Sequence, residues 1–173
     1  MLSPPTANDA QVWANDERML IHRLDPPTGK WQSVKLQDDA GGPFAGYCVY
    51  RDAQNNAYTF DFKRGGRSMA RIDAKTMQVK LFTIPTANAR GRRGRADDAG
   101  RGIWFAEYGS NKIGRFDVTS ESFAEWPVPQ AYFWPYDVVP AKNGEIWSGS
   151  MWTDHVLRLD PKTGTATLYP LPH

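Results

Sequence analysis

The sequence predicts an all-β protein built from a repeated unit, and three observations carry that prediction. Arg-X-Asp triplets begin at Arg23, Arg71, Arg115 and Arg158, which are 48, 44 and 43 residues apart. Between the turn residues, apolar and polar residues alternate over five to eight positions, as in strands with one buried face. No segment shows the apolar i, i+3, i+4, i+7 pattern of a helix, and thirteen prolines and fifteen glycines would interrupt most helices.

Each triplet stands at the same place in its unit. An aromatic-led run precedes it: "VWANDE" from Val12, "AYTFDF" from Ala57, "IWFAEY" from Ile103 and "IWSGSM" from Ile146. A turn and a second extended run follow it: "GKWQSVKL", "MQVKLFTIP", "SFAEWPVP" and "GTATLYPLP". This fixed order indicates a structural repeat.

The third unit shows how the strands follow one another. Strands are expected at 93–97, 103–108, 112–117 and 122–128, with turns between them. Four strands in about 40 residues, with Trp104 near the start of the second, are typical of a β-propeller blade. The chain is therefore interpreted as one propeller domain, 1–173, with blades at 11–36, 43–85, 91–129 and 132–172.

The number of blades is smaller than most rings need. The first unit lacks its innermost strand, so about three and three quarters blades are expected, whereas closed rings take about four to eight. The preferred interpretation is part of a larger propeller with further blades. A four-bladed ring closed by the N-terminal strands is one alternative, and association of two chains through open blade edges is another.

Composition limits the function classes. The formal net charge of +2 makes no demand for a polyanionic partner, so no nucleic-acid binding is expected. The single cysteine, Cys48, rules out a disulfide within the chain. No signal peptide and no membrane span of about 20 apolar residues is visible, which predicts a soluble chain. A periplasmic or secreted location stays open for a full-length protein.

The repeats resemble the virginiamycin B lyase family, also called streptogramin lyases. The match is "WFAEYGSNKIGRFD…FAEWPVP" from Trp104 to Pro129, supported by "GEIW…VLRLDPKTG…LYPLP" from Gly144 to Pro172. This resemblance implies a six- or seven-bladed propeller related to enzymes that open a cyclic depsipeptide at its ester with a divalent metal, magnesium or by wider analogy calcium. A broader kinship with NHL-repeat and gluconolactonase-like propellers is also implied.

The residues that this resemblance makes catalytic are absent. The lyases carry histidines eleven residues before the blade aromatic, and the same count here gives Tyr47, Arg93 and Tyr136. Trp134 stands where the lyases have a glutamate. A tyrosine is a poor base at neutral pH and an arginine cannot act as one, so no catalytic residue and no metal ligand is assigned. The three histidines of this chain, His22, His155 and His173, are interpreted as structural or solvated.

The residues at these positions instead suggest a binding site. Innermost strands line the central channel of a propeller, so a group of candidate ligand-binding residues is expected there: Tyr47, Arg93, Arg95, Glu107, Trp134, Tyr136 and Asp137. Arginine, aromatic and carboxylate groups suit a small polar ligand with an aromatic face, or a protein partner. The alternative for the acidic residues Asp16, Asp61 and Glu107 is that they cap backbone amides or tie blades together.

Two functions follow from these observations. The first is a ligand- or partner-binding propeller. The second is a lyase or lactonase-like hydrolase whose catalytic residues lie on blades outside this sequence. The basic run "ARGRRGR" from Ala89 to Arg95 is interpreted as an anion site in the channel or as a set of salt bridges where a blade begins.

Overall fold

The computed structural model describes residues 11–16 and 19–172, and the expected all-β fold is confirmed for them. Within these residues, fifteen strands form one three-stranded and three four-stranded antiparallel sheets. The first sheet contains β1 (Val12–Asn15), β2 (Leu20–Asp25) and β3 (Lys30–Lys35). The second contains β4 (Tyr50–Arg51), β5 (Ala57–Phe60), β6 (Ser68–Ile72) and β7 (Val79–Thr83).

The other two sheets repeat the second. The third contains β8 (Gly91–Ala96), β9 (Gly102–Glu107), β10 (Lys112–Asp117) and β11 (Ser122–Pro127). The fourth contains β12 (Pro135–Pro140), β13 (Ile146–Ser150), β14 (His155–Asp160) and β15 (Thr165–Pro170). Within every sheet, strands that are neighbours in sequence are also neighbours in space. No helix in the described part of the chain is long and apolar enough to cross a membrane.

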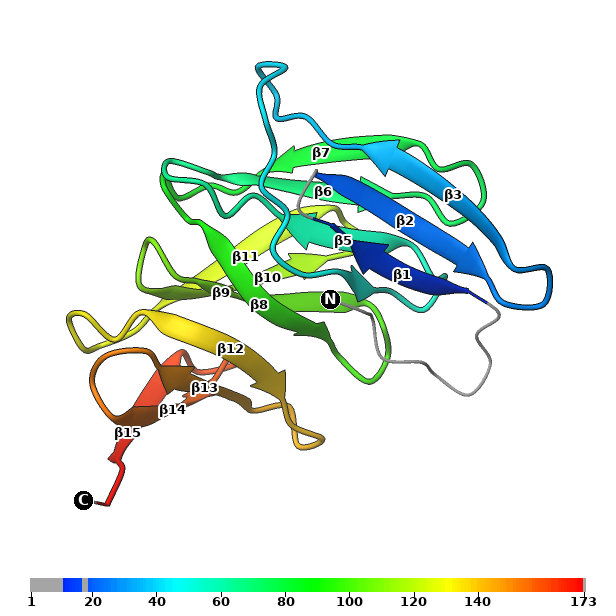
Figure 1. The fold of residues 1–173 in the computed structure, drawn as a ribbon. Coiled ribbons are helices and arrows are strands. Elements are labelled where there is room, and N and C mark those ends of the chain that lie inside the picture. The colour runs from blue at the N-terminus through cyan, green and yellow to red at the C-terminus, as the bar shows by residue number, and fades with distance from the viewer. Residues whose placement is uncertain (1–10, 17–18, 173) are drawn as a thin grey trace.

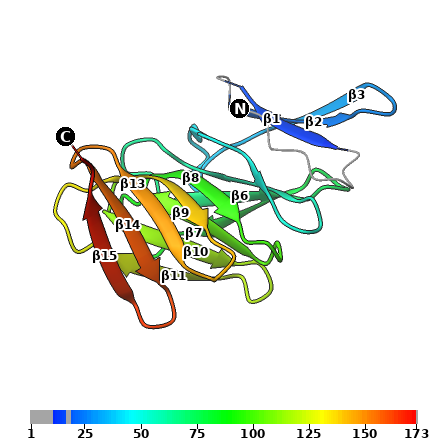
Figure 2. The same cartoon turned by 90° about the horizontal axis from the view of Figure 1, so that it is seen from below.

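The sheets follow one another along an open arc (Figure 1). The first strands of successive four-stranded sheets are in contact, β4 with β8 and β8 with β12, so they form the inner side of the arc. The sheet β1–β3 and the sheet β12–β15 lie at opposite ends of the molecule in both ribbon views (Figures 1 and 2). The structure is thus an arc and not a closed four-bladed ring.

Each sheet has two chemically different faces because side chains alternate along a strand. One face, here called the arginine face, presents a cross-strand aromatic–arginine pair: Trp13–Arg23, Tyr58–Arg71, Trp104–Arg115 and Trp147–Arg158. The other, the apolar face, presents the adjacent pair: Val12–Leu24, Ala57–Ile72, Ile103–Phe116 and Ile146–Leu159. Each repeat of the sequence therefore encodes the same two faces as well as the same order of strands.

The core forms where the arginine face of one sheet packs against the apolar face of the next. Three hydrophobic clusters fill the three junctions. Trp104, for example, packs with Ile146 and Leu159 of the following sheet and keeps only 6% of its surface exposed. In the first three sheets, the aromatic residue of this pair thus belongs to the hydrophobic cluster that joins its sheet to the next.

Candidate functional site

A bulge in the innermost strands redirects side chains toward the inner side of the arc. In the third sheet two residues, Arg92 and Arg93, stand opposite a single residue of β9. In the fourth sheet Tyr136 and Asp137 stand opposite a single residue of β13. Such a bulge bends the strand and leaves side chains outside the regular ladder, where they are free to meet those of other sheets.

Strand pairing makes Tyr47, Arg92 and Tyr136 equivalent. Each lies three positions before the residue of its own segment that pairs with the blade aromatic. Counting along the sequence gave Arg93 instead of Arg92, because the pairing register of the third sheet differs by one residue. Six residues separate the paired residues Ala96 and Ile103, whereas five separate Arg51 from Ala57 and Pro140 from Ile146. The extra residue lies in the "DDAGRG" turn and could have been noticed by aligning the Arg-X-Asp triplets and the turn glycines together.

Arg92 is the centre of the site. Its guanidinium carbon lies 4.1 Å from the ring centroid of Tyr136 and 5.0 Å from that of Tyr47, and its Nη2 donates to the Tyr47 hydroxyl at 3.3 Å. Arg93 lies 4.8 Å from the ring centroid of Tyr136. Hydrogen bonds with Arg92 and then with Tyr136 lower the pKa of the Tyr47 phenol against the effect of its burial.

Two further aromatic side chains enclose Arg92. Phe62 and Tyr108 follow the second strands of their sheets, and their ring centroids lie 5.1 and 5.0 Å from its guanidinium carbon. Arg90 covers the same two rings at 4.8 and 5.4 Å. Phe62 and Tyr108 were not predicted as site residues, and Arg90 was considered only as part of the basic run from Ala89 to Arg95. All three lie outside the strands, in segments that only the fold brings together.

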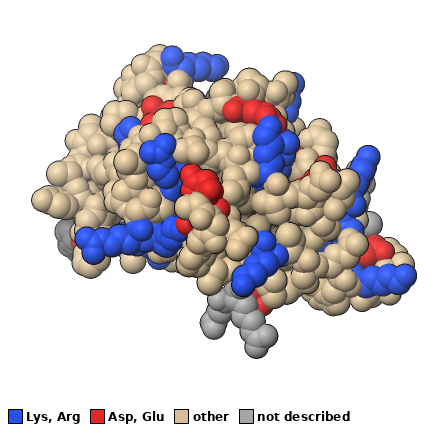
Figure 3. All heavy atoms as spheres, turned by 90° about the horizontal axis from the view of Figure 1, so that it is seen from above, with Lys and Arg blue, Asp and Glu red and all other residues tan. Residues whose placement is uncertain are grey.

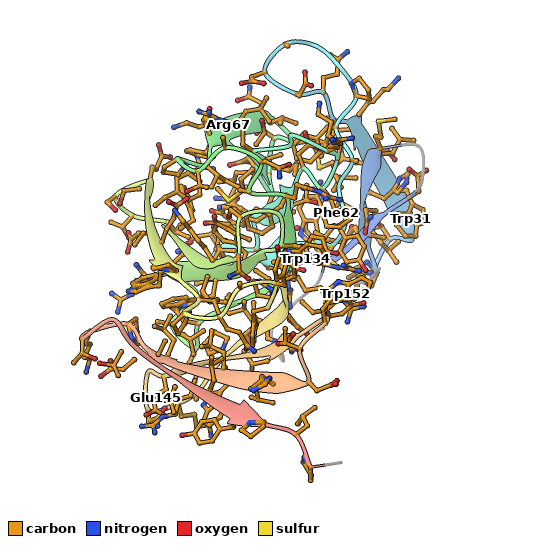
Figure 4. The ribbon with its side chains drawn as sticks, turned by 90° about the vertical axis from the view of Figure 1, so that its left-hand side faces the viewer. Trp31, Phe62, Arg67, Trp134, Glu145 and Trp152 are labelled. Carbon is orange, nitrogen blue, oxygen red and sulfur yellow. The ribbon has the colours of Figure 1, made fainter. Side chains whose placement is uncertain are left out.

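The aromatic residues continue beyond Tyr108 as a chain of ring contacts. Trp134 lies 5.6 Å from Tyr108 and 5.7 Å from Trp152, while Tyr132 packs edge-on against Trp134 at 6.2 Å. Trp152 is 63% exposed and Tyr132 is 71% exposed, so the outer end of the chain faces solvent. Figure 4 shows Phe62, Trp134 and Trp152 gathered in the middle of the molecule. The complete set is here called the arginine–aromatic cluster: Tyr47, Phe62, Arg90, Arg92, Arg93, Tyr108, Trp134, Tyr136 and Trp152.

This cluster carries positive charge without a carboxylate partner. Among the described residues, no Asp or Glu lies within ion-pair distance of Arg90, Arg92 or Arg93. The Nε atoms of Arg92 and Arg93 are buried and have no hydrogen-bond partner there. On the face of the molecule that Figure 3 shows, several basic side chains lie next to acidic ones. Half-buried guanidinium groups that contact aromatic faces and have no carboxylate partner are suited to an anion.

Arg95 and Asp137 lie further along the innermost strands and pair with each other. Arg95 Nη2 is 3.5 Å from Asp137 Oδ2 and so links β8 to β12. Both side chains reach solvent, since 54% of Arg95 and 29% of Asp137 is exposed. This pair is a blade-to-blade contact next to the cluster.

Glu107 lies apart from the cluster, inside its own sheet. Its side chain is fully buried, and its Oε2 accepts a hydrogen bond from the Ser110 hydroxyl at 2.7 Å, while Oε1 has no partner among the described residues. Burial raises the pKa of Glu107 to about 8, with a further contribution from the nearby Glu125. Glu125 itself accepts from Thr86 and pairs with Lys112 at 3.2 Å.

The other acidic residues and the histidines serve local contacts. Asp61 accepts from the amide of Ala45 at 3.1 Å, and Asp16 accepts from the amide of Leu20 at 3.0 Å, as expected for residues that cap backbone amides. His22 lies 2.7 Å from the Ser33 hydroxyl. His155 contacts the carbonyl of Thr153, and His173 is outside the described residues.

The described residues do not fit a divalent metal. No group of three His, Cys, Asp or Glu residues within 11–16 and 19–172 could hold one. The equivalent positions of the three four-stranded sheets hold Tyr47, Arg92 and Tyr136, and the fixed positive charge of Arg92 opposes a cation. No step of a reaction is therefore derived through a metal.

A concavity lies between the third and fourth sheets, beside the β8–β9 and β12–β13 turns. Its volume is about 260 Å³, and Trp104, Arg115 and Lys142 contribute to its lining. Arg115 is already paired there, at 3.9 Å from Asp97 and 3.1 Å from Asp117. These internal pairs distinguish this concavity from the arginine–aromatic cluster.

Radially arranged four-stranded sheets whose innermost strands meet at a common site define a β-propeller. Comparison with solved structures agrees. The chain superposes on virginiamycin B lyase from Staphylococcus aureus with a TM-score of 0.80 and 19% identity, covering 94% of this chain and 53% of that one. A catalytically inactive variant of that lyase with quinupristin gives a TM-score of 0.82 and 17% identity, covering 99% and 55%.

The likeness extends to other propellers. The WD40 repeats of RRP9 superpose with a TM-score of 0.76 and 9% identity, covering 94% of this chain and 48% of that one. The chain thus spans about half the length of the solved structures that it matches. No protein-family model matches the sequence, and no curated protein matches it. At these identities the comparisons show the fold, and the expected likeness to virginiamycin B lyase propellers is confirmed.

Proposed function

We propose that this β-propeller binds a small organic anion with an aromatic or planar part at the arginine–aromatic cluster. The observation that carries the proposal is the position of Arg92, which is held between four aromatic rings with no carboxylate partner among the described residues. A carboxylate or phosphate group would supply the anionic partner that the guanidinium groups of Arg92 and Arg93 lack among the described residues.

The aromatic rings of the cluster would bind the planar part of the ligand. Within the cluster, the chain of rings from Tyr108 through Trp134 to Trp152 leads from Arg92 to solvent. Flat apolar surfaces of this kind favour a stacked ring, and a few polar groups beside them fix its orientation. The proposed ligand therefore has an anionic group that binds Arg92 and a planar group that stacks on the tryptophans.

The alternative function, a lyase or lactonase-like hydrolase, has less support from this site. A base at neutral pH is needed, and the equivalent positions hold Tyr47, Arg92 and Tyr136. Glu107, whose pKa of about 8 is suitable for a base, is buried in its own sheet beside Ser110. Catalysis would then depend on residues outside this sequence.

Titration calorimetry with three probes tests the proposal: benzoate, 4-hydroxybenzoate and indole-3-acetate. We expect at least one aromatic carboxylate to bind, and acetate and benzyl alcohol to bind more weakly because each lacks one half of the ligand. Arg92→Gln should weaken the binding at least about tenfold, because a charge-assisted hydrogen bond contributes about 1.5–3 kcal/mol and each 1.4 kcal/mol is tenfold.

Arg67→Gln is the matched control, since Arg67 is exposed and lies away from the cluster (Figure 4). It should leave the affinity unchanged, and near-ultraviolet circular dichroism should show that both variants keep their tertiary packing. Equal affinities of the wild type and Arg92→Gln, or no binding of any aromatic carboxylate, would contradict the proposal.

A further inference from the structure

The turns between the first and second strands of the four-stranded sheets repeat one backbone position. Asn55, Gly100 and Gly144 occupy it, since each donates its amide to the carbonyl three residues earlier and has a positive φ. In the second and third sheets, the carbonyl at this position accepts a hydrogen bond from the preceding sheet. Trp13 Nε1 donates to Asn55 at 3.0 Å, and the Ala53 amide donates to Gly100 at 3.2 Å. Each bond closes one junction between neighbouring sheets.

No corresponding bond joins the described residues of the third and fourth sheets. Within these residues, the Gly144 carbonyl accepts no hydrogen bond, and Trp104, the equivalent of Trp13, donates none from its Nε1. The packing of the turns differs as well. A Cβ on Gly100 would lie 2.6 Å from the Ala53 nitrogen, whereas a Cβ on Gly144 would meet no atom within 4 Å. The third junction is therefore open at the point where the other two are closed.

The concavity of about 260 Å³ lies at this opening, because both Trp104 and Gly144 contribute to its lining. Trp104 is only 6% exposed, yet its Nε1 is not among the fully enclosed polar atoms that lack a partner. The indole N–H thus remains available to a molecule in the concavity. An occupant that accepts from this donor and donates to the Gly144 carbonyl is favoured, since unpaired polar groups in a nearly buried place cost free energy.

The lining carries charges of both signs. Asp97 and Asp98 come from the β8–β9 turn, Arg115 from β10 and Lys142 from the β12–β13 turn, and their formal charges cancel. Arg115 is paired with Asp97 and Asp117. The side chains of Asp98 and Lys142 are exposed and have no partner in the part of the chain that the structure describes. One free charge on each sheet suits an occupant that carries both signs.

The rest of the lining is apolar. It consists of Ala99, Pro140, Ala141 and Ile146, together with the ring of Trp104. The volume is slightly below the about 300–1,000 Å³ of pockets for drug-sized ligands. A smaller molecule with a short aliphatic part therefore fits this concavity.

We propose that this concavity, here called the junction site, binds a small zwitterion of the aliphatic α-amino acid class. The ammonium group donates to the Asp98 carboxylate and to the Gly144 carbonyl. The carboxylate group accepts from Trp104 Nε1 and from Lys142. Each group of the ligand thus bridges the third and fourth sheets and supplies the bond that the other junctions make directly. The junction site shares no residue with the arginine–aromatic cluster, so the two sites can be tested independently.

Nuclear magnetic resonance of the ¹⁵N-labelled chain tests the proposal, with the Trp104 indole signal as the reporter. The probes are L-alanine, L-valine and L-leucine, because none has an aromatic group for the arginine–aromatic cluster. We expect at least one of them to shift the Trp104 signal in a saturable way, and Trp104→Phe assigns that signal among the seven tryptophans. Isopentylamine and 4-methylpentanoate, which each lack one charged group of leucine, should bind more weakly.

Two substitutions remove the charged contacts without changing the core. Asp98→Asn and Lys142→Gln alter exposed side chains, and each should weaken the affinity about tenfold, as expected for the loss of a charge-assisted hydrogen bond. Asp39→Asn and Lys162→Gln, which are exposed and lie outside the concavity, are the matched controls and should leave the affinity unchanged. Arg92→Gln should also leave it unchanged, because Arg92 belongs to the other site.

Four results would overturn the proposal. A Trp104 signal that none of the three amino acids moves would mean that the concavity holds water alone. Unchanged affinities in both Asp98→Asn and Lys142→Gln would exclude the two charged contacts. Binding of isopentylamine or 4-methylpentanoate as tight as that of leucine would show that an ion is recognised instead of a zwitterion. Loss of binding in Arg92→Gln would place the amino acid at the arginine–aromatic cluster. None of these results depends on whether that cluster binds an aromatic carboxylate.

Discussion

The guanidinium carbon of Arg92 on β8 lies 4.1 Å from the ring centroid of Tyr136 on β12. The two residues are equivalent positions of neighbouring sheets and are turned toward each other by the same kind of bulge. A repeated backbone irregularity thus gathers different side chains from different units at one place.

The pKa of Tyr47 should depend on its contact with Arg92. Arg92 donates to the Tyr47 hydroxyl and lowers its pKa. Arg92→Gln removes the positive charge, so the pKa of Tyr47 should rise. Nuclear magnetic resonance of ¹³Cζ-labelled tyrosine, with Tyr47→Phe for assignment, measures it. An unchanged titration would show that Arg92 does not contact Tyr47 in solution.

Burial of Glu107 should make stability depend on pH. Its pKa is about 8 in the folded chain and 4.5 is its ordinary value, so between these pH values the folded state binds more protons than the unfolded state. The free energy of unfolding should therefore fall as pH rises through this window, by on the order of a few kcal/mol. Glu107→Gln stays neutral and should be more stable than the wild type at alkaline pH, as measured by urea denaturation.

Glu121→Gln is the control for that experiment. The Glu121 carboxylate pairs with Lys80 and Arg71, and the hydrogen bond from Lys80 first of all lowers its pKa. Its contribution to stability is present above the ordinary pKa of glutamate and is lost as pH falls through the lowered value. Glu121→Gln should consequently leave the slope between neutral and alkaline pH unchanged. Parallel curves for the wild type and Glu107→Gln would disprove the assignment.

Trp104→Ala should test the packing of one sheet on the next. Trp104 is 6% exposed and lies in the cluster between the third and fourth sheets. Its truncation should reduce the free energy of unfolding by about 3–5 kcal/mol. The control is Trp152→Ala, which should cost much less because that side chain is 63% exposed. Similar losses for both variants in urea denaturation would contradict the junction.

Gly94→Ala should test the close approach of β8 and β9. A Cβ at Gly94 would lie 2.1 Å from the carbonyl oxygen of Trp104, which is backbone and cannot rotate away. Overpacking of this kind typically costs about 1–3 kcal/mol. Gly149→Ala meets open space and should have little effect on thermal unfolding. A harmless Gly94→Ala would show that the two strands are further apart.

The sequence predicted the architecture because every unit encodes it independently. The third unit was expected at 93–97, 103–108, 112–117 and 122–128, and its strands are 91–96, 102–107, 112–117 and 122–127. Alternation of apolar residues sets which face is buried, and turn residues set where each strand ends. Both signals are local and recur four times in the chain.

Tertiary structure alone decided which side chains meet. Counting selected Tyr47 and Tyr136 but took Arg93 in place of Arg92, because one extra turn residue shifts the register of the third sheet. Phe62 and Tyr108 carry no sequence signal, since their contact with Arg92 joins loops that are distant in the chain. Periodicity fixes the position of a residue within its own sheet, whereas contacts between sheets depend on bulges and turn lengths.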